Sequence, residues 1–358
     1  MRILFLFIDQ LRHDFATSDD KLMSFLSSLG GTIYENCWTP TPNTTRAMAC
    51  LTTGEPQTVN KCNTPIRTAG FYLPSHINTM FDDLSDKGYS SDVYYFPREL
   101  AAGVLPLQES VRYNKNRDLP GFCKGIAKEE NQFVWLSTDI VHANMNTAGY
   151  TAENMMKGCQ LSLDFIKNSI DLLDATSYDH VFIFSDHGCL LANDARNTAT
   201  YMSNKRCQVF MFHHAKEDVG ITKSSKFCSL LSLRPTVNEL IGSQKTDFYD
   251  FSLFSEEQKE YYVFEDTVSY KPRAGNTNEM WCLKFNDCEV YLDRKSYSVY
   301  GDLKCSVDEA IKIICEESSM YINDDSSILT KDATAVSRYE HMSAQARKHF
   351  IRDEGVWW

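Results

Sequence analysis

The most constraining feature of this sequence is a hydrophobic strand that ends in polar residues. Residues 181–191 read VFIFSDHGCLL, so an apolar run leads directly into Asp186 and His187. The start of the chain, MRILFLFIDQ, shows the same arrangement, with an apolar run over residues 3–8 followed by Asp9. Continuous apolar runs of this kind are typical of strands that are buried on both faces of a parallel sheet. The sequence therefore predicts two central strands with carboxylates at their ends.

Apolar runs and helical patterns alternate over the first 246 residues. In the clearest helix, residues 152–173, apolar side chains recur every three or four positions. Further strands are expected at residues 91–96, 132–137 and 208–212, and further helices at residues 20–29, 77–87 and 230–241. This alternation predicts an α/β fold with a mostly parallel central sheet and helices on both faces, whose ligands gather at the carboxyl ends of the strands. Asp9, Asp139 and Asp186 lie at such ends.

The pattern changes at about residue 247. Short strands are expected at residues 260–268, 280–285, 288–293 and 296–300, and the last roughly 60 residues have helical periodicity. We therefore expect two parts: a metal-binding catalytic α/β domain over residues 1–246, and a smaller C-terminal subdomain over residues 247–358, with an antiparallel sheet and a helical tail packed on the first.

Composition excludes several classes of protein. The net charge is −12 and the lysines and arginines are scattered, which argues against nucleic acid polymers and anionic membranes as partners. No apolar segment approaches the ~20 residues of a membrane span. The twelve cysteines form no CxxC pair, so we expect buried, reduced thiols in a cytoplasmic protein. A small anionic ester, whose charge a metal neutralises, fits as substrate, and a homo-oligomer remains open.

Two carboxylates and an imidazole are expected to meet at one edge of the sheet. Asp9 alone could equally be the N-cap of the segment that follows it. Asp186 and His187 change that balance, because a second strand ends the same way and lies near the first in a parallel sheet. Together the three side chains predict a site for a divalent metal ion.

A third polar segment covers residues 37–56, CWTPTPNTTRAMACLTTGEP. Its prolines stiffen an extended approach, after which Thr44 or Thr45 caps a helix that runs to about Thr53 and that Gly54 ends. A hydroxyl at a helix N-terminus lies where the helix dipole favours an anion such as phosphate. The alternative is that this threonine is an ordinary N-cap.

In this order, the segments resemble the alkaline phosphatase superfamily, and especially its sulfatase and phosphodiesterase branches. The resemblance covers roughly residues 1–60 and 130–245 and includes CSLLSLRPTVNELIG after the SDHG segment. Sulfatases carry a Cys-x-Pro-Ser-Arg motif whose cysteine becomes formylglycine. Here an ungapped alignment places Thr44 at that cysteine, followed by Thr45 and Arg46, so the motif is absent. A threonine nucleophile resembles the phosphodiesterase branch instead.

The resemblance implies that Asp9, Asp186 and His187 hold a metal ion and that Thr44 is a nucleophile bound to the same ion. The chemistry agrees, because a free threonine hydroxyl is a poor nucleophile that a metal activates. Gln10 matches the Asp-Gln pair of phosphonate monoester hydrolases, where typical sulfatases have Asp-Asp. We therefore expect one divalent ion in preference to two, with zinc or manganese ahead of calcium or magnesium.

Other side chains receive secondary roles. Asp139 and His142 are the less favoured candidates for a second metal site, to which His213 or His214 could add one ligand. Otherwise His142 protonates the leaving group, or it is a surface loop histidine. Further candidates bind the anionic substrate: Gln10, Asn43, Arg46 and Lys205, with Arg206 an equal contender to Lys205 and a solvated pair as the alternative for both. Tyr94, Tyr95 and Arg98 are pocket candidates by position alone.

The leading hypothesis is a metal-dependent phosphoester or phosphonoester hydrolase, or a phosphotransferase, that forms a covalent phosphothreonine. Two alternatives stay open. One is a sulfuric ester hydrolase without formylglycine, which is disfavoured because threonine cannot form the geminal diol that expels sulfate. The other is an inactive protein that binds ligands with the same fold.

Overall fold

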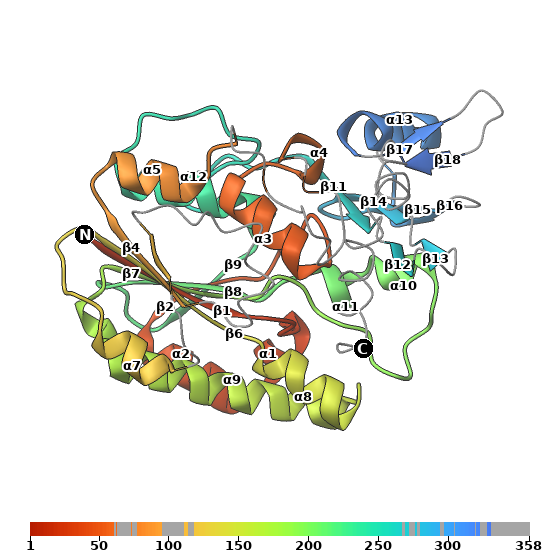
Figure 1. Cartoon of the computed structure of the whole chain (residues 1–358). Coiled ribbons are helices and arrows are strands. Elements are labelled where there is room, and N and C mark those ends of the chain that lie inside the picture. The colour runs from red at the N-terminus through yellow and green to blue at the C-terminus, as the bar shows by residue number, and fades with distance from the viewer. Residues whose placement is uncertain are drawn as a thin grey trace, which may run out of the picture.

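The computed structural model describes residues 1–60, 62, 73, 77–94, 111–113, 118–266, 269–271, 276–277, 280–293, 297–303, 305–318, 320–322 and 328–330. Its centre is an eight-stranded sheet with helices on both faces, and a smaller sheet lies beside one end of it (Figure 1). The predicted α/β class, with a mostly parallel sheet and a small antiparallel one, is confirmed.

The strand order of the central sheet is β5-β4-β6-β1-β7-β8-β2-β9. β1 lies in the middle, parallel to β6 on one side and to β7 on the other. The strands are β1 (Arg2–Ile8), β2 (Gly31–Tyr34), β4 (Ser90–Tyr94), β5 (Val111–Tyr113), β6 (Gln132–Thr138), β7 (His180–Phe184), β8 (Met211–Ala215) and β9 (Ile221–Ser224).

One strand of this sheet runs against the others. β8 is antiparallel both to β7 and to β2, whereas every other strand pair of the sheet is parallel. The sequence predicts a strand here, at residues 208–212, and the structure places it slightly later. Because β8 is antiparallel, its carboxyl end lies at the opposite edge of the sheet from the ends of β1 and β7.

Residues of β1 alternate between two hydrophobic cores. Phe5 and Phe7 point into one core and Leu4 and Leu6 into the other, as the two-residue period of a strand requires. The first core packs under helices on one face: α3 (Thr44–Thr53), α5 (Met80–Asp86), the 3-10 turn η2 (Leu230–Ser232) and α12 (Leu233–Leu240). The short helix α4 (Gln57–Asn60) packs against α3. The other face is covered by α1 (His13–Ser18), α2 (Asp20–Leu29), α7 (Leu119–Lys124), α8 (Ile140–Ala148), α9 (Ala152–Leu173) and η1 (Ala175–Ser177) (Figure 1).

The C-terminal region builds its own antiparallel sheet, in the order β11-β14-β15-β16. Its strands are β11 (Tyr261–Asp266), β14 (Met280–Phe285), β15 (Glu289–Asp293) and β16 (Tyr297–Tyr300). Two separate two-stranded sheets lie in the same region of the chain: β12 (Ser269–Lys271) with β13 (Asn276–Thr277), and β17 (Met320–Ile322) with β18 (Ile328–Thr330). A further two-stranded sheet pairs β3 (Cys37–Trp38) with β10 (Cys228–Ser229), both from the first 246 residues. The remaining helices are α10 (Thr198–Tyr201), α11 (Asn204–Cys207) and α13 (Val307–Glu317).

The predicted helical tail is only partly present in the described residues. α13 is helical, but β17 and β18 form a hairpin where the periodicity favours helix, and residues 331–358 lie outside the described part. The small sheet packs on the first 246 residues through a shared cluster in which Trp38 stacks on Phe264 at 5.7 Å. The division at residue 246 stays a prediction, since one apolar cluster crosses it.

The cysteines agree with expectation: ten of the twelve are buried and all are free thiols. Within the described part of the chain, no helix has the length and apolar character needed to cross a membrane.

Candidate functional site

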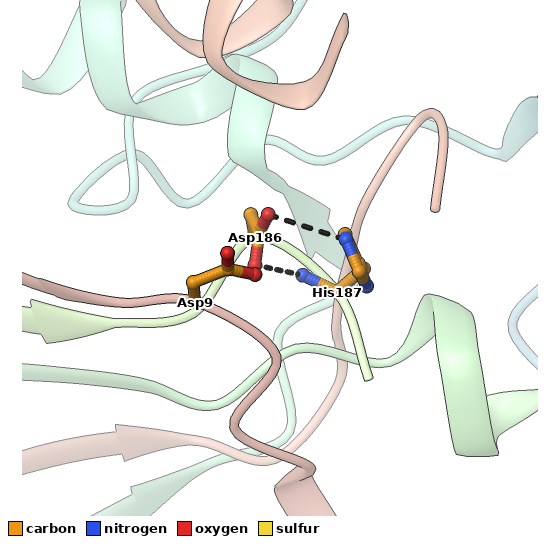
Figure 2. A group of neighbouring side chains, drawn as sticks. All are labelled: Asp9, Asp186 and His187. Atoms are coloured by element: carbon orange, nitrogen blue, oxygen red, sulfur yellow. Dashed lines mark hydrogen bonds and ion pairs between the residues drawn. The ribbon is translucent and has the colours of Figure 1, made fainter. Parts of the chain in front are cut away.

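Three ligand-type side chains meet at the carboxyl ends of β1 and β7. Asp9 follows β1 directly, and its N–H donates to Thr138 O of β6 at 2.9 Å. Asp186 and His187 follow β7, the neighbour of β1 on the other side. One ligand atom from each of Asp9, Asp186 and His187 lies within 4.8 Å of the others, and all three side chains are buried (Figure 2). The predicted convergence is confirmed.

The two carboxylate oxygens of Asp186 have different surroundings. Oδ1 accepts the backbone N–H groups of Gln10 (3.1 Å) and His187 (2.9 Å). Among the residues that the structure describes, none donates a hydrogen bond to Oδ2, and His187 Nε2 lies 3.4 Å from it. Gln10 reaches Asp186 with a φ of 67°, a left-handed conformation that costs a non-glycine residue about 1–3 kcal/mol. A fully buried carboxylate oxygen without a donor suits a cation.

His187 is oriented by its own loop. Its Nδ1 lies 2.7 Å from Gly188 O, so Nδ1 carries the proton and donates to that carbonyl. Nε2 then keeps its lone pair on the side of Asp186 and Thr44. A backbone carbonyl that fixes the tautomer in this way is the usual second partner of a metal-binding histidine. The residues thus fit a divalent cation with oxygen and nitrogen ligands.

Charge repulsion between the carboxylates also points to a cation. Burial, together with the charge of Asp9, raises the pKa of Asp186 to about 6. Burial also opposes ionisation of Asp9, but the neighbouring His142, His187 and Thr44 hydroxyl hold the pKa of Asp9 below its usual value. Two buried carboxylates that compete for one proton are stabilised together by a divalent ion.

Thr44 lies at the first position of α3, beside this group. Its Oγ1 is 3.4 Å from Asp9 Oδ1 and 3.3 Å from His187 Nε2. The prediction that Thr44 or Thr45 caps the helix is wrong, because Asn43 is the N-cap and its Oδ1 accepts the N–H of Arg46 at 3.4 Å. The cap therefore leaves the Thr44 hydroxyl turned to the carboxylates, at the positive end of a ten-residue helix.

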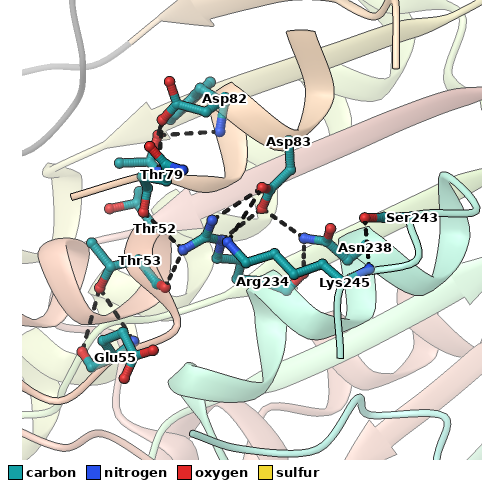
Figure 3. Close-up of polar contacts among 12 residues, drawn as sticks. Thr52, Thr53, Glu55, Thr79, Asp82, Asp83, Arg234, Asn238, Ser243 and Lys245 are labelled. Carbon is teal, nitrogen blue, oxygen red and sulfur yellow. Dashed lines mark hydrogen bonds and ion pairs between the residues drawn. The ribbon is translucent and has the colours of Figure 1, made fainter. Parts of the chain in front are cut away.

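A buried ion pair between Arg234 and Asp83 stabilises the C-terminal end of α3. Gly54 ends the helix in the left-handed region, as predicted, and the carbonyl of Thr53 accepts from Arg234 Nη1 at 2.6 Å. The Arg234 guanidinium also donates two hydrogen bonds to the Asp83 carboxylate of α5, at 2.6 and 3.0 Å (Figure 3). Asn238 adds a third bond to that carboxylate at 2.8 Å. The LRPTVNELIG segment therefore positions α3 and does not itself contact the three ligand residues.

Helix α8 brings a further histidine to the site. His142 Nδ1 lies 3.4 Å from Asp9 Oδ2; burial disfavours its charged form, but the Asp9 carboxylate raises the pKa of His142 above its ordinary value. Asp139 is the N-cap residue of α8. Among the residues that the structure describes, the one group of three metal ligands is that of Asp9, Asp186 and His187. A second site with Asp139 and His142, and a single ion, both remain predictions.

Sequence reasoning missed Tyr150. This residue follows α8, lies against the side chain of Gln10 and donates from its hydroxyl to Asn146 Oδ1 at 2.6 Å. Burial raises the pKa of Tyr150 to about 12, so its hydroxyl stays protonated. Gln10 Oε1 is buried and accepts no hydrogen bond among the described residues. His142 and Asn146 share one face of α8, but Tyr150 lies beyond Gly149, the C-cap of that helix, so helical spacing gave no signal for Tyr150.

The two basic candidates before β8 have distinct partners. Lys205 Nζ pairs with Asp194, whereas Arg206 is buried and bonds to Pro42 O and to Asp266. The donors of the Arg206 guanidinium are therefore used in hydrogen bonds within the protein. A role for Lys205 in substrate binding stays a prediction. Arg46 is fully buried in the first turn of α3.

Other candidates lie elsewhere. The idea that His213 or His214 reaches the site is wrong, since β8 is antiparallel and sets His213 beside His180, with 3.1 Å between their ring nitrogens. Tyr94 is buried at the end of β4 and contacts the ring of Phe122. Tyr95 and Arg98 lie outside the described residues.

Comparisons with known proteins agree with this fold. No family model matches the sequence, and no curated protein matches it. Among solved structures, the phosphonate monoester hydrolase SpPMH from Silicibacter pomeroyi matches with a TM-score of 0.64 at 11% identity, over 92% of this chain and 99% of that one. The 2-O GAG sulfatase BT1596 gives 0.63 at 14% identity, over 88% and 89%. An alkaline phosphatase superfamily protein from Vibrio parahaemolyticus gives 0.56 at 15% identity, over 99% and 88%.

The chain is thus an α/β protein with a ligand-type cluster at the carboxyl edge of its sheet. More particularly, it has the fold of the alkaline phosphatase superfamily in its sulfatase-like form.

Proposed function

We propose that this protein is a metal-dependent ester hydrolase or phosphotransferase that acts on phosphoesters or phosphonoesters through a covalent Thr44 intermediate. The observation that carries the proposal is the position of the Thr44 hydroxyl, 3.4 Å from Asp9 Oδ1 and 3.3 Å from His187 Nε2, at the N-terminus of α3. Small anionic esters fit such a site, because the helix dipole and a cation both favour negative charge.

The proposed reaction has two displacements. Thr44 Oγ1 gives up its proton to solvent and attacks phosphorus, the new O–P bond replaces the bond to the leaving alcohol, and the departing oxygen takes a proton. His142, whose Nδ1 lies 3.4 Å from Asp9 Oδ2 and whose helix α8 covers the other face of the sheet from α3, is proposed to supply that proton. Water or a second alcohol then attacks the phosphothreonine, takes over the phosphoryl group and returns the threonine hydroxyl. Which acceptor enters decides between hydrolase and transferase.

Asp9, Asp186 and His187 would hold the divalent ion, with zinc or manganese favoured over calcium or magnesium. When bound, the ion would lower the pKa of the threonine hydroxyl and neutralise charge on the substrate. Asn43, Arg46 and Gln10 are proposed to bind the phosphoryl oxygens.

A sulfuric ester hydrolase is the second candidate, because sulfatases are among the structures of the same fold. It is less favoured since an unmodified threonine stands where sulfatases carry formylglycine. An inactive binding protein with this fold is the third candidate.

Hydrolysis assays on matched threonine variants test the proposal. We would measure metal content, then turnover of p-nitrophenyl phosphate, bis-p-nitrophenyl phosphate, a p-nitrophenyl phosphonate ester and p-nitrophenyl sulfate with each metal. Thr44→Ala is the test variant and Thr45→Ala the control, because Thr45 is a buried neighbour in the same helix turn. Acid-quenched protein would be digested, and mass spectrometry of the peptides would detect a phosphoryl group on the peptide that carries Thr44.

We expect turnover of a phosphorus ester that Thr44→Ala removes and Thr45→Ala keeps, and a phosphorylated peptide in the parent. Turnover of the sulfate alone would favour the second candidate. A parent with bound metal and no turnover of any of the four esters, even with glycerol added as acceptor, would favour the binding protein.

A further inference from the structure

The segment that leads to Thr44 is held from two sides. On one side, Thr39 N–H donates to Cys207 O of α11 at 2.8 Å. On the other side, Glu265 N–H, from β11 of the C-terminal sheet, donates to Pro40 O at 3.0 Å. Because the prolines lack N–H groups, Pro40 and Pro42 can be fixed through their carbonyl oxygens only. The last of these carbonyls, Pro42 O, lies two residues before Thr44.

Arg206 binds that last carbonyl. Its Nη2 donates to Pro42 O at 3.1 Å, and its Nη1 donates to Asp266 Oδ2 at 3.0 Å and to Tyr201 O at 3.2 Å. Asp266, at the end of β11, is fully buried, and the Arg206 side chain is 10% exposed. A planar guanidinium that bonds in several fixed directions holds its partners in one geometry, which the flexible ammonium of lysine does not.

The backbone of Arg206 binds the other half of the site. Gly188 N–H donates to Arg206 O at 2.8 Å, directly after the ligand residue His187. The two backbones are in close contact, since a Cβ on Gly188 would lie 2.2 Å from Lys205 O. One residue therefore touches the metal-ligand loop through its carbonyl and the nucleophile segment through its side chain.

We propose that Arg206 is a positioning residue that sets Thr44 against the metal ligands, and that Asp266 of the C-terminal sheet holds Arg206 in place. The inference rests on the proposed function of Thr44. It gives the C-terminal sheet a part in turnover, although that sheet supplies none of the three ligand residues. In this role Arg206 does not bind the substrate.

The proposal predicts different effects on the metal affinity of the site and on the position of Thr44. A side-chain substitution keeps the Arg206 carbonyl, so the loop of His187 and the metal affinity should persist. The same substitution releases Pro42, so Thr44 should lose its position. A misplacement of about 1 Å can lower the rate about 100-fold.

The test compares Arg206→Lys with Arg234→Lys. Both changes remove a buried arginine fork that bonds to an aspartate and to a backbone carbonyl next to α3, but Arg234 holds the far end of the helix. We would measure kcat and KM on the best p-nitrophenyl ester, the dissociation constant for Mn²⁺ alone by calorimetry, and urea unfolding. Asp266→Asn, which keeps the shape of the side chain, is a third variant that still applies if Arg206→Lys fails to fold.

We expect both lysine variants to lose stability, and Arg206→Lys alone to lose about 100-fold in kcat with unchanged KM and Mn²⁺ affinity. Asp266→Asn should lower kcat in the same way, though less. The proposal is overturned if kcat survives in Arg206→Lys and Asp266→Asn, if Mn²⁺ affinity falls in parallel with kcat, or if Arg234→Lys loses as much kcat. Retained turnover in Thr44→Ala would instead refute the proposed function.

Discussion

Replacing Arg234 with methionine should cost about 3–5 kcal/mol of unfolding free energy, the usual loss when one partner of a buried ion pair is removed. The guanidinium donates four hydrogen bonds: two to Asp83, one to Thr53 O and one to Asn78 O. Methionine fills similar space but leaves those two carbonyls without this donor, at about 1–3 kcal/mol each. It also leaves Asp83 with the amide of Asn238 at 2.8 Å as its remaining short contact in this group.

Urea unfolding followed by circular dichroism measures this loss as a shift of the midpoint at constant slope. Lys223→Met is the control, because its pair with Glu35 is exposed at both ends and such pairs contribute at most about 1 kcal/mol. A loss below about 1 kcal/mol in Arg234→Met, equal to that of the control, would show that the Arg234 network does not fasten α3.

The same variant should change how stability depends on pH. Burial opposes ionisation of Asp83, but the hydrogen bonds and charge of Arg234 hold the pKa of Asp83 below its ordinary 3.8. A lowered pKa in the folded state contributes stability above the unfolded pKa and loses it as pH falls through the folded value. In Arg234→Met only the Asn238 hydrogen bond and the Lys245 charge still oppose the effect of burial on this pKa, so the deficit relative to the parent should be larger at about pH 7 than at about pH 3. An equal deficit at both pH values would contradict this assignment.

Three further outcomes are expected. Zn²⁺ or Mn²⁺ at 100 times its dissociation constant should stabilise the parent by about 2.7 kcal/mol, and Asp186→Asn should weaken that binding at least about 10-fold by calorimetry. Gly188→Ala should lose about 1–3 kcal/mol in urea unfolding, because the added Cβ would meet Lys205 O at 2.2 Å and Arg12 Cγ at 2.8 Å. Asn43→Ala should lose about 1 kcal/mol of stability, which Asn43→Ser should largely restore as an alternative N-cap, and no such rescue would mean that the cap is not what stabilises α3.

Local patterns were enough for the elements that carry the site. α9 was predicted at its observed bounds, and the predictions for β1, β6 and β7 differ from the observed strands by one residue at an end. These elements have strong periodicity or continuous apolar runs, so side-chain burial by itself selects them. The convergence of Asp9 with Asp186 and His187 followed from the strand ends alone, because parallel neighbours end at one edge of the sheet.

Long-range pairing was not readable in the same way. An apolar run has the same composition in a parallel and in an antiparallel strand, so the direction of β8, and with it the exclusion of His213, needed the structure. The sequence IVHANMNTA shows no clear apolar period, so helix α8 was missed, although His142 was expected at the site and its Nδ1 lies 3.4 Å from Asp9 Oδ2. β17 and β18, which pair with each other, replaced a predicted helix, because backbone pairing between two neighbouring segments outweighed the helical periodicity.

By itself, the sequence determined the strand ends, the residue types at the site and the end of α3 at Gly54, because these depend on local burial patterns and on helix signals. Only the tertiary structure decided that Asn43 caps α3 while Thr44 faces the ligands, and that Arg206 joins both halves of the site to Asp266. Those contacts link residues up to 164 positions apart, and their geometry depends on how separate elements pack against one another.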